Sequence, residues 1–120
     1  MNPRRIVHLT DVSLITCIVQ RGVGDIVAQA AQDAGAQGAT IYYARGTGVR
    51  QRLGALGVTV DAEKEVVNII VATSQQEAVF DAIYLAGELD TPGMGIAFIT
   101  PLEKAATYIP PEVLDRRQES

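Results

Sequence analysis

The sequence has little of what enzymes and metal proteins commonly use. Its 120 residues include one cysteine, one histidine and no tryptophan. A lone cysteine cannot form an intrachain disulfide, and the position of Cys17 within an apolar strand pattern predicts a buried, inert thiol. His8 lies outside the repeated units described below, and no His, Cys, Asp and Glu residues show the spacing of a metal or catalytic site. We therefore expect a protein that is not an enzyme.

Long apolar runs and concentrated positive charge are also missing. The sequence contains no run of ~18 apolar residues, which predicts no membrane span, and its N-terminus does not match a secretory signal. A net charge of -4, with the acidic residues spread along the chain, argues against nucleic-acid binding. We expect one cytoplasmic domain over residues 1–120, with a core at about 12–109 and a disordered tail at 112–120.

A strand-helix-strand pattern occurs twice in the chain. Strand-like segments at 13–19 and 39–43 flank a helical pattern at 23–34. Strand-like segments at 66–72 and 95–100 flank a second helical pattern at 75–86. Two β-α-β units in tandem predict an α+β, ferredoxin-like βαββαβ fold with a four-stranded antiparallel sheet.

Local signals mark the ends of these elements. Gly35 is typical of the residue that follows a helix, and Gly87 is expected to help end the second helix. Ser74 and Glu77 have the spacing of a capping box at the start of that helix. Residues 105–109 are expected to form a further short strand.

Two glycine-containing segments are the candidates for ligand binding. The first contains Arg45, Gly46, Thr47, Gly48, Arg50, Gln51 and Arg52, and the second contains Thr91, Gly93, Met94 and Gly95. Glycines expose backbone N–H groups, and arginines offer paired donors to phosphate or carboxylate. Both segments are equally compatible with ordinary turns and a solvated surface. The glycine-rich stretch at 51–61 is expected to be mobile without a partner.

The order of these motifs resembles the P-II family of nitrogen-regulatory signalling proteins across residues 13–109. The family's glycine-aromatic-glycine-arginine-glutamine segment is similar to residues 46–51, with threonine replacing the aromatic residue and one residue inserted. Its phosphate-side loop is similar to residues 91–98. The resemblance implies a homotrimer that binds adenine nucleotides in clefts between subunits. It also implies that the 45–64 loop contacts an enzyme or a transporter, whose identity the sequence leaves open.

The ligand-binding residues that the resemblance implies are Arg45, Gly46, Thr47, Gly48, Arg50, Gln51, Thr91, Gly93, Met94, Gly95 and Lys104. Members that bind ATP carry a lysine where this chain has Ile96, and paired arginines in the region of 105–109, where Lys104 is the only nearby cation. Burying a triphosphate without such cations is costly. We therefore expect ADP or AMP in preference to ATP, or a Kd above ~100 μM; 2-oxoglutarate binding stays open.

The sequence thus predicts a non-catalytic signal-transduction protein that binds a small effector and regulates a partner protein. The alternative is a small ferredoxin-like trimer that binds a metal or has a structural role, as in the copper-tolerance CutA-like proteins. Stabilisation by an adenine nucleotide would favour the first interpretation, and stabilisation by a divalent ion would favour the second.

Overall fold

A computed structural model describes residues 6–46 and 62–112 of the chain. Its elements are β1 (His8–Leu9), β2 (Val12–Gln20), α1 (Gly24–Asp33), β3 (Thr40–Gly46), β4 (Ala62–Ala72), a 3-10 turn (Thr73–Gln75), α3 (Gln76–Ala86), β5 (Gly95–Leu102) and β6 (Ala105–Ala106). The order from β2 to β5 confirms the predicted βαββαβ arrangement. The segment at 51–61, predicted to be mobile, and the tail at 113–120 lie outside the described residues.

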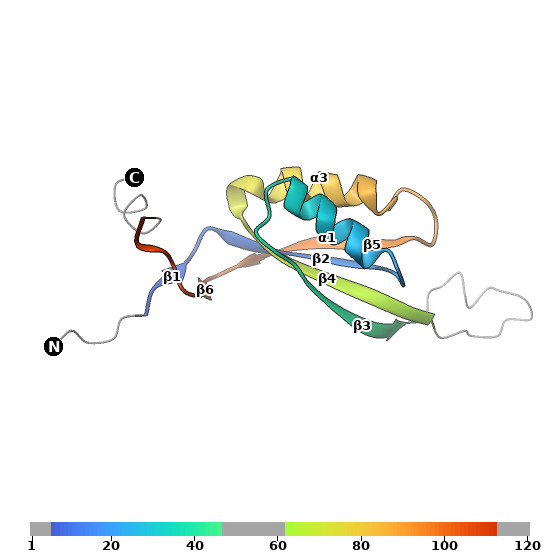
Figure 1. Cartoon of the computed structure of the whole chain (residues 1–120), viewed down its shortest axis with the longest axis horizontal. Helices are drawn as coiled ribbons and strands as arrows, with labels where there is room; N and C mark the ends of the chain where they lie inside the picture. Colours follow the sequence, from blue (N-terminus) through green and yellow to red (C-terminus); the bar gives the residue numbers. More distant parts are fainter. Residues whose placement is uncertain (1–5, 47–61, 113–120) are drawn as a thin grey trace, which may run out of the picture.

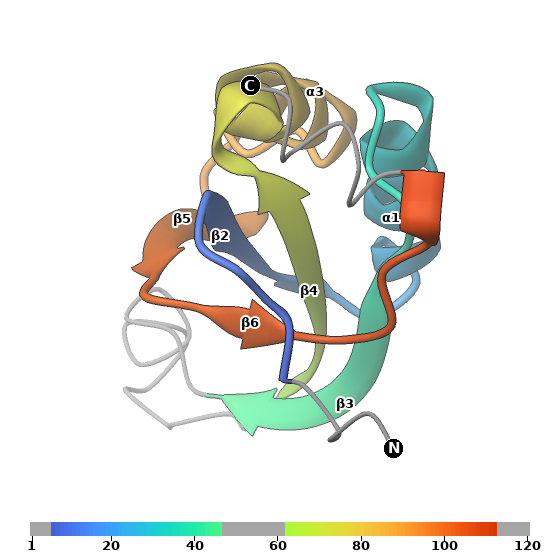
Figure 2. The same cartoon turned by 90° about the vertical axis from the view of Figure 1, so that its left-hand side faces the viewer.

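The main sheet has four strands in the order β3-β4-β2-β5, and each neighbouring pair is antiparallel. This order confirms the ferredoxin-like prediction. Both helices lie on one face of the sheet, and no other described element covers the opposite face (Figure 1). The view from the end shows the same two layers (Figure 2).

A second, two-stranded ribbon was only partly predicted. Of the expected strand at 105–109, Ala105–Ala106 forms β6, which pairs with β1 at His8–Leu9. The ribbon extends beyond one end of the main sheet, away from the helices (Figure 1). A two-residue strand with one partner leaves almost no periodic signal, so the sequence could not indicate β1.

The core lies between the helices and the covered face of the sheet. Because successive strand residues point to opposite faces, alternate residues of β2 and β4 meet the helices. The residues that are fully buried here are Ile15, Cys17, Val19, Val67, Ile69, Val27, Ala31, Val79 and Ile83. The apolar pattern of the first helix also included Ile26, which is instead 54% exposed.

Helix α1 is capped at both ends by hydrogen bonds that backbone N–H groups donate. At its start, the buried carboxylate of Glu65 accepts hydrogen bonds from the N–H groups of Gly22 at 2.7 Å and Gly24 at 2.9 Å. At its end, Gly35 has φ +115° and its N–H bonds the carbonyl of Gln32, while the Ala36 N–H bonds that of Ala31. This is a Schellman motif, which confirms the role predicted for Gly35.

Helix α3 ends at Gly87 as predicted, but it begins differently. The capping box was wrong: the 3-10 turn precedes α3, and no side chain caps either element. Gly87 is the C-cap with ordinary φ, and Glu88 takes the left-handed position with φ 54°. Gly87 is also closely packed: a Cβ there would lie 3.1 Å from the carbonyl oxygen of Ile83 and 3.3 Å from Cγ2 of Val27.

Candidate functional site

One end of the main sheet brings together the base of the long loop and the second glycine segment. In the register of the strands, Arg45 of β3 lies opposite Glu63 of β4, and Gln20 of β2 lies opposite Lys64 of β4. On the other side of β2, Gly95 pairs with Val19. The two segments that carry the candidate residues therefore share one end of the sheet.

The turn that contains Gly93 is held to the end of β2. The side-chain amide of Gln20 donates a hydrogen bond to the carbonyl oxygen of Gly93 at 2.7 Å. Within the turn, the Thr91 N–H donates to Glu88 and the Met94 N–H donates to Thr91. These two amides are engaged, and Pro92 has none, so Gly93 is the residue of this turn with an N–H for an anion. Its φ of +84° suits glycine.

Gly95 is required for a different reason. Its φ is +150°, and a Cβ built on it would overlap the carbonyl oxygen of Ile18. The glycine therefore allows β5 to approach β2 closely at the start of their ladder. In contrast, a Cβ on Gly93 would meet nothing within 4 Å. The two glycines of one motif thus have separate roles, one in backbone conformation and one in strand packing.

Arg45 and Gly95 share one end of the sheet but not one edge. Arg45 lies exposed on β3 and Gly95 on β5, which are the two edge strands. Three strand spacings of ~4.8 Å separate them, or about 14 Å. Within one chain, Arg45 and Gly95 therefore lie on opposite edges of the sheet.

Lys104 lies farther away. It follows β5, whose two ends are Gly95 and Leu102. At ~3.3 Å per residue, the strand places Lys104 more than about 20 Å from the glycine turn. Within one chain, Lys104 and the glycine turn therefore do not form one site. Thr47, Gly48, Arg50 and Gln51 lie outside the described residues, as does Arg52.

Two residues that sequence reasoning missed lie between the edges. Gln20 and Lys64 are directly opposite one another on β2 and β4. By strand alternation, both belong to the face without helices. Lys64 is half-buried and adds a cation next to the residue that holds the glycine turn. A polar residue that ends an apolar strand, such as Gln20 after residues 12–19, was the available signal.

The described residues give little support for thiol or metal chemistry. Cys17 is fully buried, and desolvation raises the pKa of its thiol to about 11, which confirms an inert thiol. Over residues 6–46 and 62–112, no group of three or more His, Cys, Asp or Glu side chains could hold a metal ion. No helix in the same ranges is long and apolar enough to cross a membrane.

Comparisons with known proteins agree with this fold. The chain is similar to an Arabidopsis thaliana PII structure with bound citrate, with a TM-score of 0.59, 23% identity, and 78% of this chain and 79% of that chain covered. It is also similar to a DUF3240 family protein from Shewanella baltica OS155, with a TM-score of 0.63, 16% identity, and coverage of 84% and 100%. The comparison with curated proteins found no match.

The family assignment depends on a separate match. The model of the family described as "Nitrogen regulatory protein P-II" matches residues 12–110, from the first residue of β2 to beyond β6. Since this match spans most of the sequence, the chain belongs to the P-II family of non-catalytic signalling proteins.

Proposed function

We propose that this protein is a homotrimeric regulator that binds a small anionic effector in clefts between subunits and controls a partner enzyme or transporter through its 45–64 loop. The observation that carries the proposal is the placement of the two candidate segments. They lie at the same end of the sheet but on opposite edges. A cleft that contains both Arg45 and the glycine turn is therefore best formed by two copies, each contributing one edge of the sheet.

The uncovered face of the sheet supports association between copies. It exposes Tyr42 by 48%, Ile70 by 53%, Ile96 by 57% and Phe98 by 43%. Leu14 and Ile18 are only half-buried beside them. Exposed apolar surface of this kind marks an interaction site. Family members are typically trimers, and a cyclic trimer would bury three such faces against one another.

The charges at the effector end favour few phosphates. The cations in the described part of this end are Arg21, Arg45 and Lys64, and Arg21 forms an ion pair with Glu63. Ile96, on the uncovered face, brings no charge. The proposed ligand residues remain Arg45, Gly46, Thr47, Gly48, Arg50, Gln51, Thr91, Gly93, Met94 and Gly95, now with Gln20 and Lys64. Lys104 follows the far end of β5 and is not part of this set. We infer that ADP or AMP fits better than ATP.

Sedimentation combined with calorimetry tests the proposal. We expect a trimer at micromolar subunit concentration, and ADP or AMP binding more tightly than ATP, for which Kd is above ~100 μM. Citrate and 2-oxoglutarate belong in the panel, since a structure similar to this chain carries citrate. We expect Lys64→Ala to raise the Kd of the bound nucleotide about tenfold or more. A monomer would contradict the proposed assembly. Sub-micromolar binding of ATP would contradict the ligand assignment.

A further inference from the structure

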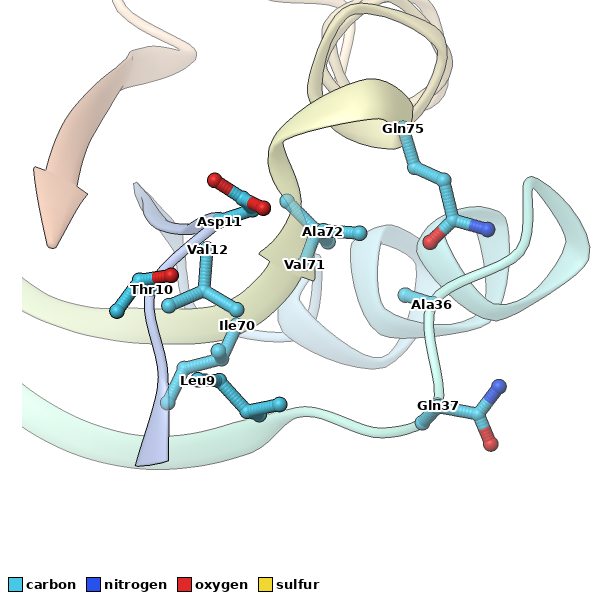
Figure 3. Close-up of a pocket in the computed structure, with 10 residues that line it drawn as sticks. All are labelled: Leu9, Thr10, Asp11, Val12, Ala36, Gln37, Ile70, Val71, Ala72 and Gln75. Carbon is cyan, nitrogen blue, oxygen red and sulfur yellow. The ribbon is translucent and has the colours of Figure 1, made fainter. Parts of the chain in front are cut away.

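A cavity of about 420 Å³ lies at the end of the sheet opposite the glycine turn. It is formed by the link from β1 to β2, the end of β4, the loop between α1 and β3, and the turn before α3. Leu9, Val12 and Ile70 form one side and Ala36 and Gln75 the other (Figure 3). Thr10 and Asp11 add polar groups at the rim. The volume falls within the range of ligand pockets, and its apolar wall with few polar groups suits an amphipathic occupant.

The two most exposed large apolar side chains of the described residues flank the β1–β6 ribbon beside this cavity: Ile6 lies two residues before β1 and Tyr108 lies two residues after β6. Ile6 is 82% exposed and Tyr108 is 79% exposed. Neither lines the cavity of its own chain. The ribbon extends beyond the end of the main sheet, away from the helices (Figure 1, Figure 2). Exposed apolar side chains next to an apolar cavity mark an interaction site.

We propose that Tyr108 of one copy inserts into this cavity of the next copy, so that the ribbons link the subunits in a ring. A tyrosine matches the cavity because its ring is apolar and its hydroxyl can bond polar groups at the rim, such as Asp11 and Gln75. The cavity is also continuous with the uncovered face, since Val12 and Ile70 belong to both. A contact between two different surfaces of identical chains produces a closed ring of subunits when the rotations between neighbouring copies add up to a full turn. The inference rests on the proposed trimer.

The absence of tryptophan provides a clean reporter. In Tyr108→Trp, the only tryptophan should emit at shorter wavelength in the trimer than free tryptophan does, and should return to solvent-like emission when dilution separates the copies. Leu85→Trp is the control, because Leu85 is 69% exposed on the helix layer. Its emission should stay solvent-like at every concentration. Filling the cavity with Ala72→Arg should abolish the wavelength shift of Tyr108→Trp.

Cross-linking gives a second measurement. Ala72 lines the cavity, and native Cys17 is buried, so Ala72→Cys with Tyr108→Cys should be joined between chains by a short bis-maleimide. We expect a covalent ladder up to the trimer, and no ladder from either single variant. Solvent-like emission or no ladder in a sedimenting trimer would overturn this contact alone. Blue emission that survives dilution would place Tyr108 within its own chain and overturn it as well. A wild-type monomer would overturn the proposed assembly too.

Discussion

The two faces of the main sheet have similar apolar content and opposite surroundings. On the face under the helices, Ile15, Cys17 and Ile69 have no exposed surface. On the other face, Tyr42, Ile70 and Phe98 are each exposed by about half. The covered face is what one chain needs in order to fold. The uncovered face is a surface that one chain cannot bury alone, which is why we ascribe it to assembly.

Strand β2 shows the same contrast within one element. Its residues are apolar at both alternating positions: Ile15, Cys17 and Val19 face the helices, whereas Val12, Leu14 and Ile18 face away. A strand that faces solvent on one side usually alternates apolar and polar residues. Thr16 and Asn68 are the polar exception at the centre of the uncovered face, and they satisfy each other through a hydrogen bond of 2.8 Å.

Adjacent isoleucines on β4 allow a direct test of the two faces. Ile69→Ala should lower the free energy of unfolding by about 3 to 4 kcal/mol, because it opens a cavity in the covered core. This loss should be the same at every subunit concentration. Ile70→Ala removes the same atoms from the uncovered face, so its effect should be small in the monomer and appear as weaker assembly. Denaturation and sedimentation across a concentration series measure both.

One result would contradict this assignment of the two faces. Equal, concentration-independent losses for Ile69→Ala and Ile70→Ala would mean that Ile70 contributes to the fold and not to a contact between copies. The uncovered face would then need another explanation than self-association.

The two glycines at the start of β5 give the next largest difference. Gly95→Ala should destabilise the fold by roughly 3 kcal/mol, because its Cβ overlaps the Ile18 carbonyl and its φ is unfavourable for alanine. Gly93→Ala has free space around it and should cost only about 1 kcal/mol for its φ of +84°. Chemical denaturation of both variants measures the two losses in the free energy of unfolding. Similar losses would show that backbone conformation, not strand packing, determines both positions.

The carboxylate at the start of α1 should have a smaller effect. Glu65→Ala leaves two N–H groups, of Gly22 and Gly24, without their acceptor, and we expect a loss of about 2 kcal/mol. The matched control is Glu63→Ala, two residues earlier on the same strand. Its ion pair with Arg21 is exposed on both sides, so the expected loss is below about 0.5 kcal/mol. If Glu65→Ala unfolds no more easily than Glu63→Ala, the capping role is wrong.

The regular elements were predictable because their signals are local. Apolar periodicity marked both helices and the four long strands, and Gly35 marked the end of α1 through its left-handed conformation. The capping box failed because Ser74 lies inside a 3-10 turn, where the local pattern is the same but the backbone path differs. Glu65 as the cap of α1 could not be predicted, since the two partners are about 40 residues apart in the chain.

The site was less predictable because it depends on register and on more than one chain. The sequence indicated the two glycine segments but not that β4 and β2 separate them. Lys64 was overlooked because a lysine at the end of a loop has no special pattern. Only its pairing with Gln20 makes it a candidate. The cavity and the ribbon beside it combine residues from both ends of the chain, and no local pattern encodes such a combination.

The thiol at the centre of the covered face provides the smallest and most specific test. Burial raises the pKa of Cys17 to about 11 from 9.0, so the thiol ionises more readily in the unfolded chain than in the folded one. Its contribution to stability is therefore complete below pH 9 and is lost as the pH rises from about 9 to 11. At pH 10 the unfolded state gains about 1 kcal/mol from this ionisation.

Cys17→Val keeps the volume of the core nearly unchanged and removes the ionisable group. The difference in unfolding free energy between wild type and Cys17→Val should be constant from pH 6 to 8. It should then shift by about 1 kcal/mol in favour of the variant at pH 10. Subtracting the variant cancels the contributions of all other ionisable groups, because both proteins contain them. A difference that stays flat to pH 10 would mean that water reaches Cys17 between the helices and the sheet. The covered face would then be less closed than its zero exposure indicates.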